Sequence, residues 1–101
     1  MEQIERINQM EQRMEQATVA VKELSAALTQ YEEAQEAIRT LEEYLGSKEW
    51  KKDFEDDEKG LFPKGLKRGV LSEDGIWNVL EISHQMDIQM LELVTERMKR
   101  K

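Results

Sequence analysis

The chain has 101 residues, and its 15 basic and 22 acidic side chains give a formal net charge of −7. This length suits one domain, because two domains would not each bury enough apolar surface to be stable. The charge disfavours binding to nucleic acid or to anionic membranes. The absence of cysteine excludes disulfides, thiolate catalysis and Cys-based zinc sites.

A long helix is predicted over residues 2–45, which contain neither Gly nor Pro and are rich in strong helix formers. Apolar residues recur in alternating steps of three and four, which is the spacing of a coiled-coil seam. This N-terminal seam consists of Ile7, Met10, Met14, Ala17, Val21, Leu24, Leu28 and Tyr31. After it the stripe resumes one position early, so we expect a change of packing partner or a bend near residues 25–29. Gly46 is expected to end the helix as a left-handed cap.

A second, short helix is predicted at about residues 47–59. Ser47 is the expected N-cap and Gly60 the residue that stops the helix. The apolar residues of this helix, Trp50 and Phe54, stand one turn apart and therefore share a face.

Residues 60–71 are expected to form an irregular connection, because Pro63 disfavours helical geometry in the residue before it. The last helix is predicted at about residues 72–99, with Ser72 at its start. A hydrophobic staple at this start is expected from Leu71 and Ile76. The apolar residues that follow cover a wide arc of the helix, which predicts contact with more than one neighbour.

The run from Gly69 to Gly75, Gly-Val-Leu-Ser-Glu-Asp-Gly, is the most specific segment of the chain. Together with Gly-Ser-Lys-Glu-Trp from Gly46 and Pro-Lys-Gly-Leu from Pro63, it resembles a family of small bacterial proteins. That family occurs widely in Firmicutes and is catalogued only as a domain of unknown function. The resemblance covers about residues 4–91 and implies a bacterial, cytoplasmic protein. It implies no catalytic residue.

Glu81 and His84 are the weak candidates for metal ligands, because their spacing puts both side chains on one helix face. Di-iron bundles use two such Glu-x-x-His motifs with two further carboxylates. One chain supplies a single motif, so a metal-dependent enzyme would have to assemble across a homodimer, with glutamates of the first helix. We therefore predict no catalytic residue and no cofactor within the chain.

The residues expected to bind a partner lie in the middle of the chain, where both tryptophans and the proline are found. They are Lys64, Lys67, Arg68, Trp50 and Trp77. Cations in a glycine-flanked loop contribute little to a core, so we expect the three basic residues to face solvent and contact an acidic partner. The aromatic residues have a second interpretation, since they would also plug the end of a helical hairpin.

The predicted fold is all-α, a long antiparallel helical hairpin with a short middle helix. The first helix is longer than the last, so the start of its seam lacks an intrachain partner if this helix is straight. Either the first helix breaks and folds back or a second copy covers the seam, and we expect a homodimer. The leading functional hypothesis is a non-enzymatic protein–protein interaction module in the cytoplasm, without membrane spans. The alternatives are the metal-dependent enzyme and a small nucleic-acid-associated regulator, for which the basic loop and basic C-terminus are the candidates.

Overall fold

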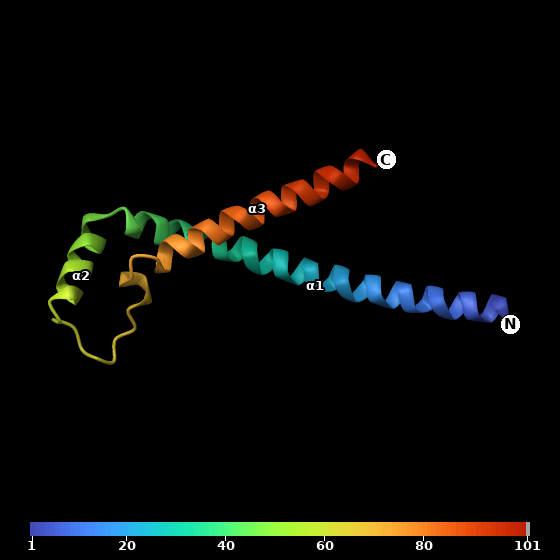
Figure 1. Cartoon of the computed structure of the whole chain (residues 1–101), viewed down its shortest axis with the longest axis horizontal. Helices are drawn as coiled ribbons and strands as arrows, with labels where there is room; N and C mark the ends of the chain where they lie inside the picture. The colour runs from blue at the N-terminus through green and yellow to red at the C-terminus, as the bar shows by residue number, and fades with distance from the viewer. Residues whose placement is uncertain (101) are drawn as a thin grey trace. The chain divides into compact units, whose positions relative to one another are not determined.

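The computed structural model describes residues 1–100, and this part of the chain is helical without strands. The elements are α1 (Glu2–Leu45), α2 (Lys48–Glu58), the short 3₁₀ helix η1 (Gly69–Leu71) and α3 (Gly75–Lys99) (Figure 1). The predicted all-α class is confirmed, and a long helix followed by a short helix and a further helix is consistent with the predicted hairpin. The chain divides into two compact units, residues 1–35 and the part that begins at Glu36.

The first unit is a single stretch of α1. Helical hydrogen bonding continues through residues 25–29 and past Tyr31, so the seam changes phase after Tyr31 without a break in the helix. Threonines within α1 do not disturb it, because each hydroxyl donates to the carbonyl four residues earlier: Thr18 to Met14 at 2.7 Å, and Thr29 to Ser25 at 3.2 Å. Such bonds satisfy the hydroxyl inside a helix.

The N-terminal seam lies exposed along this first unit. Its large side chains, from Ile7 to Leu28, have between 42% and 66% of their surface accessible. A continuous stripe of this kind on a helix is the signature of a packing face. Within its own unit it has no second helix to pack against.

The end of α1 differs from the prediction at Gly46, which does not adopt the left-handed conformation. The backbone N–H of Gly46 donates to Glu42 at 3.3 Å, and that of Ser47 donates to Tyr44 at 3.0 Å. Ser47 is extended (φ −94°, ψ 162°) and already caps the next helix. Because the extended serine redirects the chain, a left-handed glycine is not needed there.

The left-handed residue is Gly60, with φ 72°, at the end of α2. Its N–H donates to Asp57 at 2.9 Å, and the N–H of Leu61 reaches back to Asp56 at 3.2 Å. These two bonds are those of a Schellman motif, which satisfies the last carbonyls of a helix. The predicted stop of α2 at Gly60 is therefore confirmed.

The last helix begins at Gly75, three residues later than predicted. Its first backbone bond joins the N–H of Asn78 to the carbonyl of Asp74 at 2.8 Å. Ser72 still satisfies a free amide, because its Oγ accepts from the N–H of Gly75 at 2.9 Å and donates to the carbonyl of Gly69, also at 2.9 Å. The serine thus joins η1 to α3, and the intervening residues form a turn.

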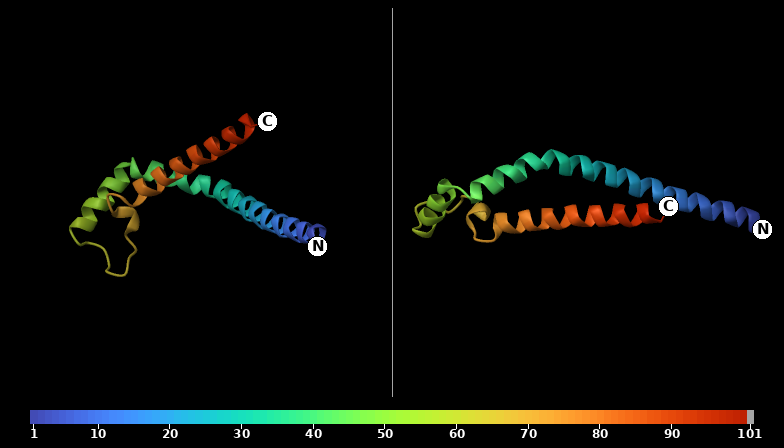
Figure 2. Two further views of the ribbon diagram at one scale, coloured as in Figure 1. Left: turned by 45° about the vertical axis from the view of Figure 1, so that its right-hand side comes forward. Right: turned by 90° about the horizontal axis from the view of Figure 1, so that it is seen from above.

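The second unit contains the only two buried side chains of residues 1–100, Leu71 and Ile76, which are 7% and 2% exposed. They are the residues predicted to form the hydrophobic staple. The last turns of α1 and the first turns of α3 run in opposite directions (Figure 2), and Leu41, Ile76 and Val79 line one hollow. No helix of the described chain combines the length and the apolar character that crossing a bilayer requires.

Candidate interaction site

The middle segment is held together by Trp50, which projects from the first turn of α2. Ser47 fixes this turn, since its Oγ accepts from the N–H of Trp50 at 3.1 Å and donates to the carbonyl of Tyr44 at 2.6 Å. The indole N–H of Trp50 donates to the carbonyl of Val70 in η1 at 2.8 Å. Its ring stacks on Phe54 with centroids 5.2 Å apart and an interplanar angle of 21°. Trp50 therefore ties α2 to η1, which supports the interpretation of this tryptophan as a structural plug.

The last turn of α1 is joined to α2 by a hydrogen bond between side chains. The Tyr44 hydroxyl donates to Oδ2 of Asp53 at 2.6 Å. Burial disfavours the charged phenolate. The Asp53 carboxylate accepts a hydrogen bond from the neutral hydroxyl and would repel a phenolate. Together these effects raise the pKa of Tyr44 to about 12. The tyrosine is therefore a permanent neutral donor at physiological pH.

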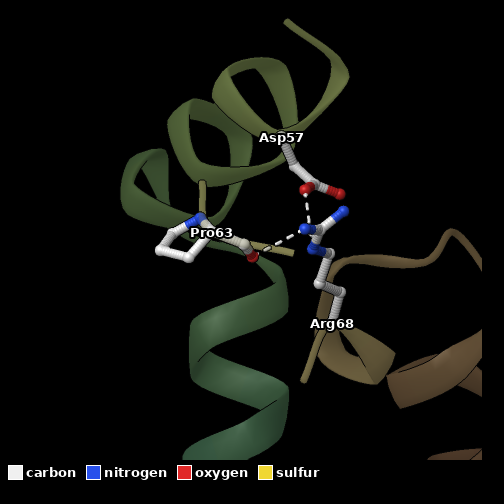
Figure 3. Close-up of polar contacts among 3 residues, drawn as sticks. All are labelled: Asp57, Pro63 and Arg68. Atoms are coloured by element: carbon white, nitrogen blue, oxygen red, sulfur yellow. Dashed lines mark hydrogen bonds and ion pairs between the residues drawn. The ribbon is translucent and has the colours of Figure 1, made fainter. Parts of the chain in front are cut away.

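Arg68 closes the loop that follows α2 (Figure 3). One terminal guanidinium nitrogen donates to the carbonyl of Pro63 at 2.8 Å, and Nε lies 3.4 Å from Oδ1 of Asp57. Both atoms of the Asp57–Arg68 ion pair are shielded from solvent, and neither has a further hydrogen-bond partner within residues 1–100. We expected Arg68 to face solvent, but it is half-buried and engaged inside the chain.

Lys64 and Lys67 lie on the surface of the loop that Arg68 closes. The N–H of Leu66 donates to the carbonyl of Pro63 at 3.2 Å, which makes residues 63–66 a turn with Lys64 and Gly65 at its tip. Both lysines are exposed, as expected from the sequence. The ordered loop thus presents two free cations, while its third cation holds the loop in place.

Trp77, at the start of α3, is 55% exposed. Trp77 is therefore not part of a buried plug, which was the second interpretation of the aromatic residues. On another side of the same helix end lies an open apolar hollow of about 440 Å³, lined chiefly by Leu41, Val70, Ile76 and Val79. Large apolar surface of this kind, exposed beside cations, is typical of interaction sites.

Glu81 and His84 lie on α3, away from the loop. Glu81 is half-buried and accepts a hydrogen bond from the side chain of Gln85 at 3.4 Å, whereas His84 is exposed. Within residues 1–100, no three acidic or histidine side chains gather closely enough to hold one metal ion.

Sequence reasoning missed the role of Asp57, which stands in an acidic run typical of a solvated helix face. Its partner Arg68 lies eleven positions further along, beyond the turn at Pro63. Helical spacing rules link residues three or four apart, so they carry no signal for an ion pair that closes a loop.

A protein-family model described as a domain of unknown function (DUF4298) matches residues 7–93. No curated protein and no solved structure matches the chain.

Proposed function

The chain belongs to the DUF4298 family, a domain of unknown function, and we propose that it is a non-enzymatic helical interaction module of the cytoplasm. In this proposal the chain forms a homodimer and binds an acidic protein partner through Lys64 and Lys67. The observation that carries it is the contrast between two buried side chains and long exposed apolar stripes on α1 and α3. Helices of this kind gain most of their stability from packing of the apolar face, so the stripes need a covering surface.

The N-terminal seam is the first surface that a second copy would cover. Its heptad spacing suits another helix, and the unit that contains it holds no helix besides α1. In the dimer Leu24 and Leu28 become buried, and the segment from Ile7 to Met14 meets the other chain.

Sedimentation of purified protein tests the homodimer. We expect Met14→Glu to weaken association, because an ionised carboxylate in an apolar contact is costly. Gln12→Glu is the matched control, since it adds the same charge to the opposite face of α1, where it should leave association unchanged. A wild-type chain that remains monomeric at high concentration would refute the homodimer.

The acidic partner is tested with the double variant Lys64→Ser/Lys67→Ser, which leaves the Asp57–Arg68 ion pair in place. We expect it to keep the wild-type melting temperature and to lose partners in a pull-down from native cytoplasm analysed by mass spectrometry. The control Lys22→Ser/Lys51→Ser removes the same charge from exposed helix positions. Captured proteins should also dissociate as salt is raised, because exposed charge pairs are screened. An unchanged set of partners would show that the loop is only a connection.

A further inference from the structure

The apolar hollow at the start of α3 has one charged residue in its lining. Ile76 is the buried part of this lining, whereas Val70 and Val79 remain 41% and 45% exposed. Among residues 1–100, Lys67 is the only charged residue that lines the hollow, and no carboxylate does so. The hollow therefore combines an apolar surface with a single positive charge.

Hydrogen bonds behind the hollow hold its walls in place. The carbonyl of Val70 accepts from the indole N–H of Trp50 at 2.8 Å. The hydroxyl of Ser72 joins Gly69 to Gly75 through two bonds of 2.9 Å, and both glycines line the hollow. Because these walls are fixed before anything binds, a ligand loses little affinity to the ordering of its site.

Lys67 stands at the hollow without an ion pair inside the chain. Its neighbour Arg68 is engaged with Asp57 and with the carbonyl of Pro63, which fixes the loop next to the lysine. The Lys67 side chain is exposed, and no carboxylate of residues 1–100 forms an ion pair with it. Its ammonium group is therefore available to a carboxylate from outside the chain.

These features match a partner segment in which an aliphatic side chain stands beside a carboxylate. The aliphatic side chain leaves water when it enters the hollow, and the carboxylate next to it reaches Lys67. A basic segment would bring a like charge against the lysine, which is repulsive. The hollow is open to solvent, so it suits one side chain of a partner whose backbone stays on the surface, and it does not enclose a free lipid tail.

We propose that the hollow beside Lys67 binds a leucine-like side chain of an acidic protein segment, with a neighbouring carboxylate paired to Lys67. This inference rests on the acidic partner proposed above and deepens it, because it names the kind of segment that the partner presents. Recognition then depends on an aliphatic residue as well as on negative charge.

Peptide binding to the full chain, followed by nuclear magnetic resonance, tests this inference. The probe is the capped peptide Asp-Asp-Leu-Asp-Asp, and its controls are Asp-Asp-Ser-Asp-Asp and Lys-Lys-Leu-Lys-Lys. We expect the acidic leucine peptide to shift the amide signals of Gly69 and Val79. It should bind at least about tenfold more tightly than the serine peptide, because its leucine side chain leaves water. The basic peptide should not bind.

Val79→Asn makes the hollow more polar without changing its charge, and valine and asparagine have similar helix propensities. In this variant we expect the preference for leucine over serine to fall below about threefold, while the serine peptide binds as it does to wild type. Val94→Asn is the matched control, because Val94 is 52% exposed on the same helix and does not line the hollow. The comparison of the two acidic peptides on wild type needs no variant, so it decides the matter even if Val79→Asn unfolds.

The outcomes separate this inference from the proposed function. If the two acidic peptides bind wild type equally, the hollow is not used and the inference is wrong, although the acidic partner survives. If the basic leucine peptide binds as well as the acidic one, Lys67 does not select the ligand and the inference is wrong. If the Gly69 and Val79 signals shift when the protein alone is concentrated, a second copy occupies the hollow instead. If neither acidic peptide shifts any signal, the inference and the acidic partner both fail.

Discussion

Gly75 stands at the first position of α3, directly against the backbone of η1. A Cβ at this position would collide with the carbonyl oxygen of Gly69 and lie 2.7 Å from Oγ of Ser72. A Cβ added to Gly69 itself would meet no atom within 4 Å. The two glycines that bound the Gly-Val-Leu-Ser-Glu-Asp-Gly run therefore differ in kind, and only the second is required by close approach.

We expect Gly75→Ala to destabilise the fold by about 2 kcal/mol, because the clash with backbone outweighs the gain in helix propensity. Gly69→Ala is the matched control and should change stability by less than about 0.5 kcal/mol. Urea unfolding at one fixed protein concentration measures both. Equal stability of the two variants would contradict the close approach of η1 and α3.

Tyr44 allows a prediction about pH. Its folded-state pKa is raised to about 12 by burial and by Asp53, whereas an unfolded tyrosine titrates near 10. The folded chain therefore holds the phenolic proton more tightly, and stability falls as pH rises from about 10 to about 12. The phenolate absorbance of wild type minus that of Tyr44→Phe, followed in the ultraviolet as pH is raised, should have its midpoint near pH 12. When the same titration is made in urea, which unfolds the chain, the midpoint should fall to about pH 10.

At the scale of the elements, each helix end is defined by hydrogen bonds made within a few residues. Ser47 caps α2 through the N–H of Trp50, and Gly60 ends it in a Schellman motif. Ser72 serves α3 in the same manner, although the first full helical turn begins only at Gly75. The hydroxyl of Ser72 has a second role, because it also donates to the carbonyl of Gly69.

Ser72→Ala removes both of these bonds, and we expect it to cost about 1 kcal/mol of stability, as the loss of an N-cap usually does. Ser25→Ala is the control, since it makes the same chemical change at an exposed position inside α1. That substitution should be neutral or slightly stabilising, because alanine is the better helix former. An unchanged melting temperature for Ser72→Ala would mean that other groups satisfy the amide of Gly75.

At the scale of the whole molecule, residues 1–100 contain only two buried side chains, Leu71 and Ile76. We expect a core of this size to fall short of offsetting the entropy lost on ordering a hundred residues. If association supplies the missing burial, folding and dimerisation are linked, and the melting temperature depends on protein concentration.

We therefore expect the melting temperature, followed by helical circular dichroism, to rise measurably when protein concentration is increased a hundredfold. Met14→Glu should lower it at every concentration, whereas Gln12→Glu should not. A melting temperature that does not change with concentration would show that one chain is stable alone, contrary to the proposed homodimer.

The sequence by itself determined the helices and most of their ends. The propensities of residues 2–45, the cap at Ser47 and the stop at Gly60 depend on neighbours within one or two turns, so their spacing could be read directly. The exposure of Lys64 and Lys67 was also predicted, because cations in a short loop have no core to enter. Gly46 was the local exception, since an extended serine directly after it removed the need for a left-handed residue.

Only the tertiary structure decided which middle residues hold the loop and which remain free. Trp50 bonds to Val70 twenty positions away, and Arg68 turns back to Asp57 across the turn at Pro63. Such pairs depend on the path of the backbone between them, which no helical period encodes. The same path brings the carbonyl of Gly69 against Gly75 and so excludes a side chain there. Local hydrogen bonding and propensity thus set the helices, whereas contacts that close a loop set the roles of the residues between them.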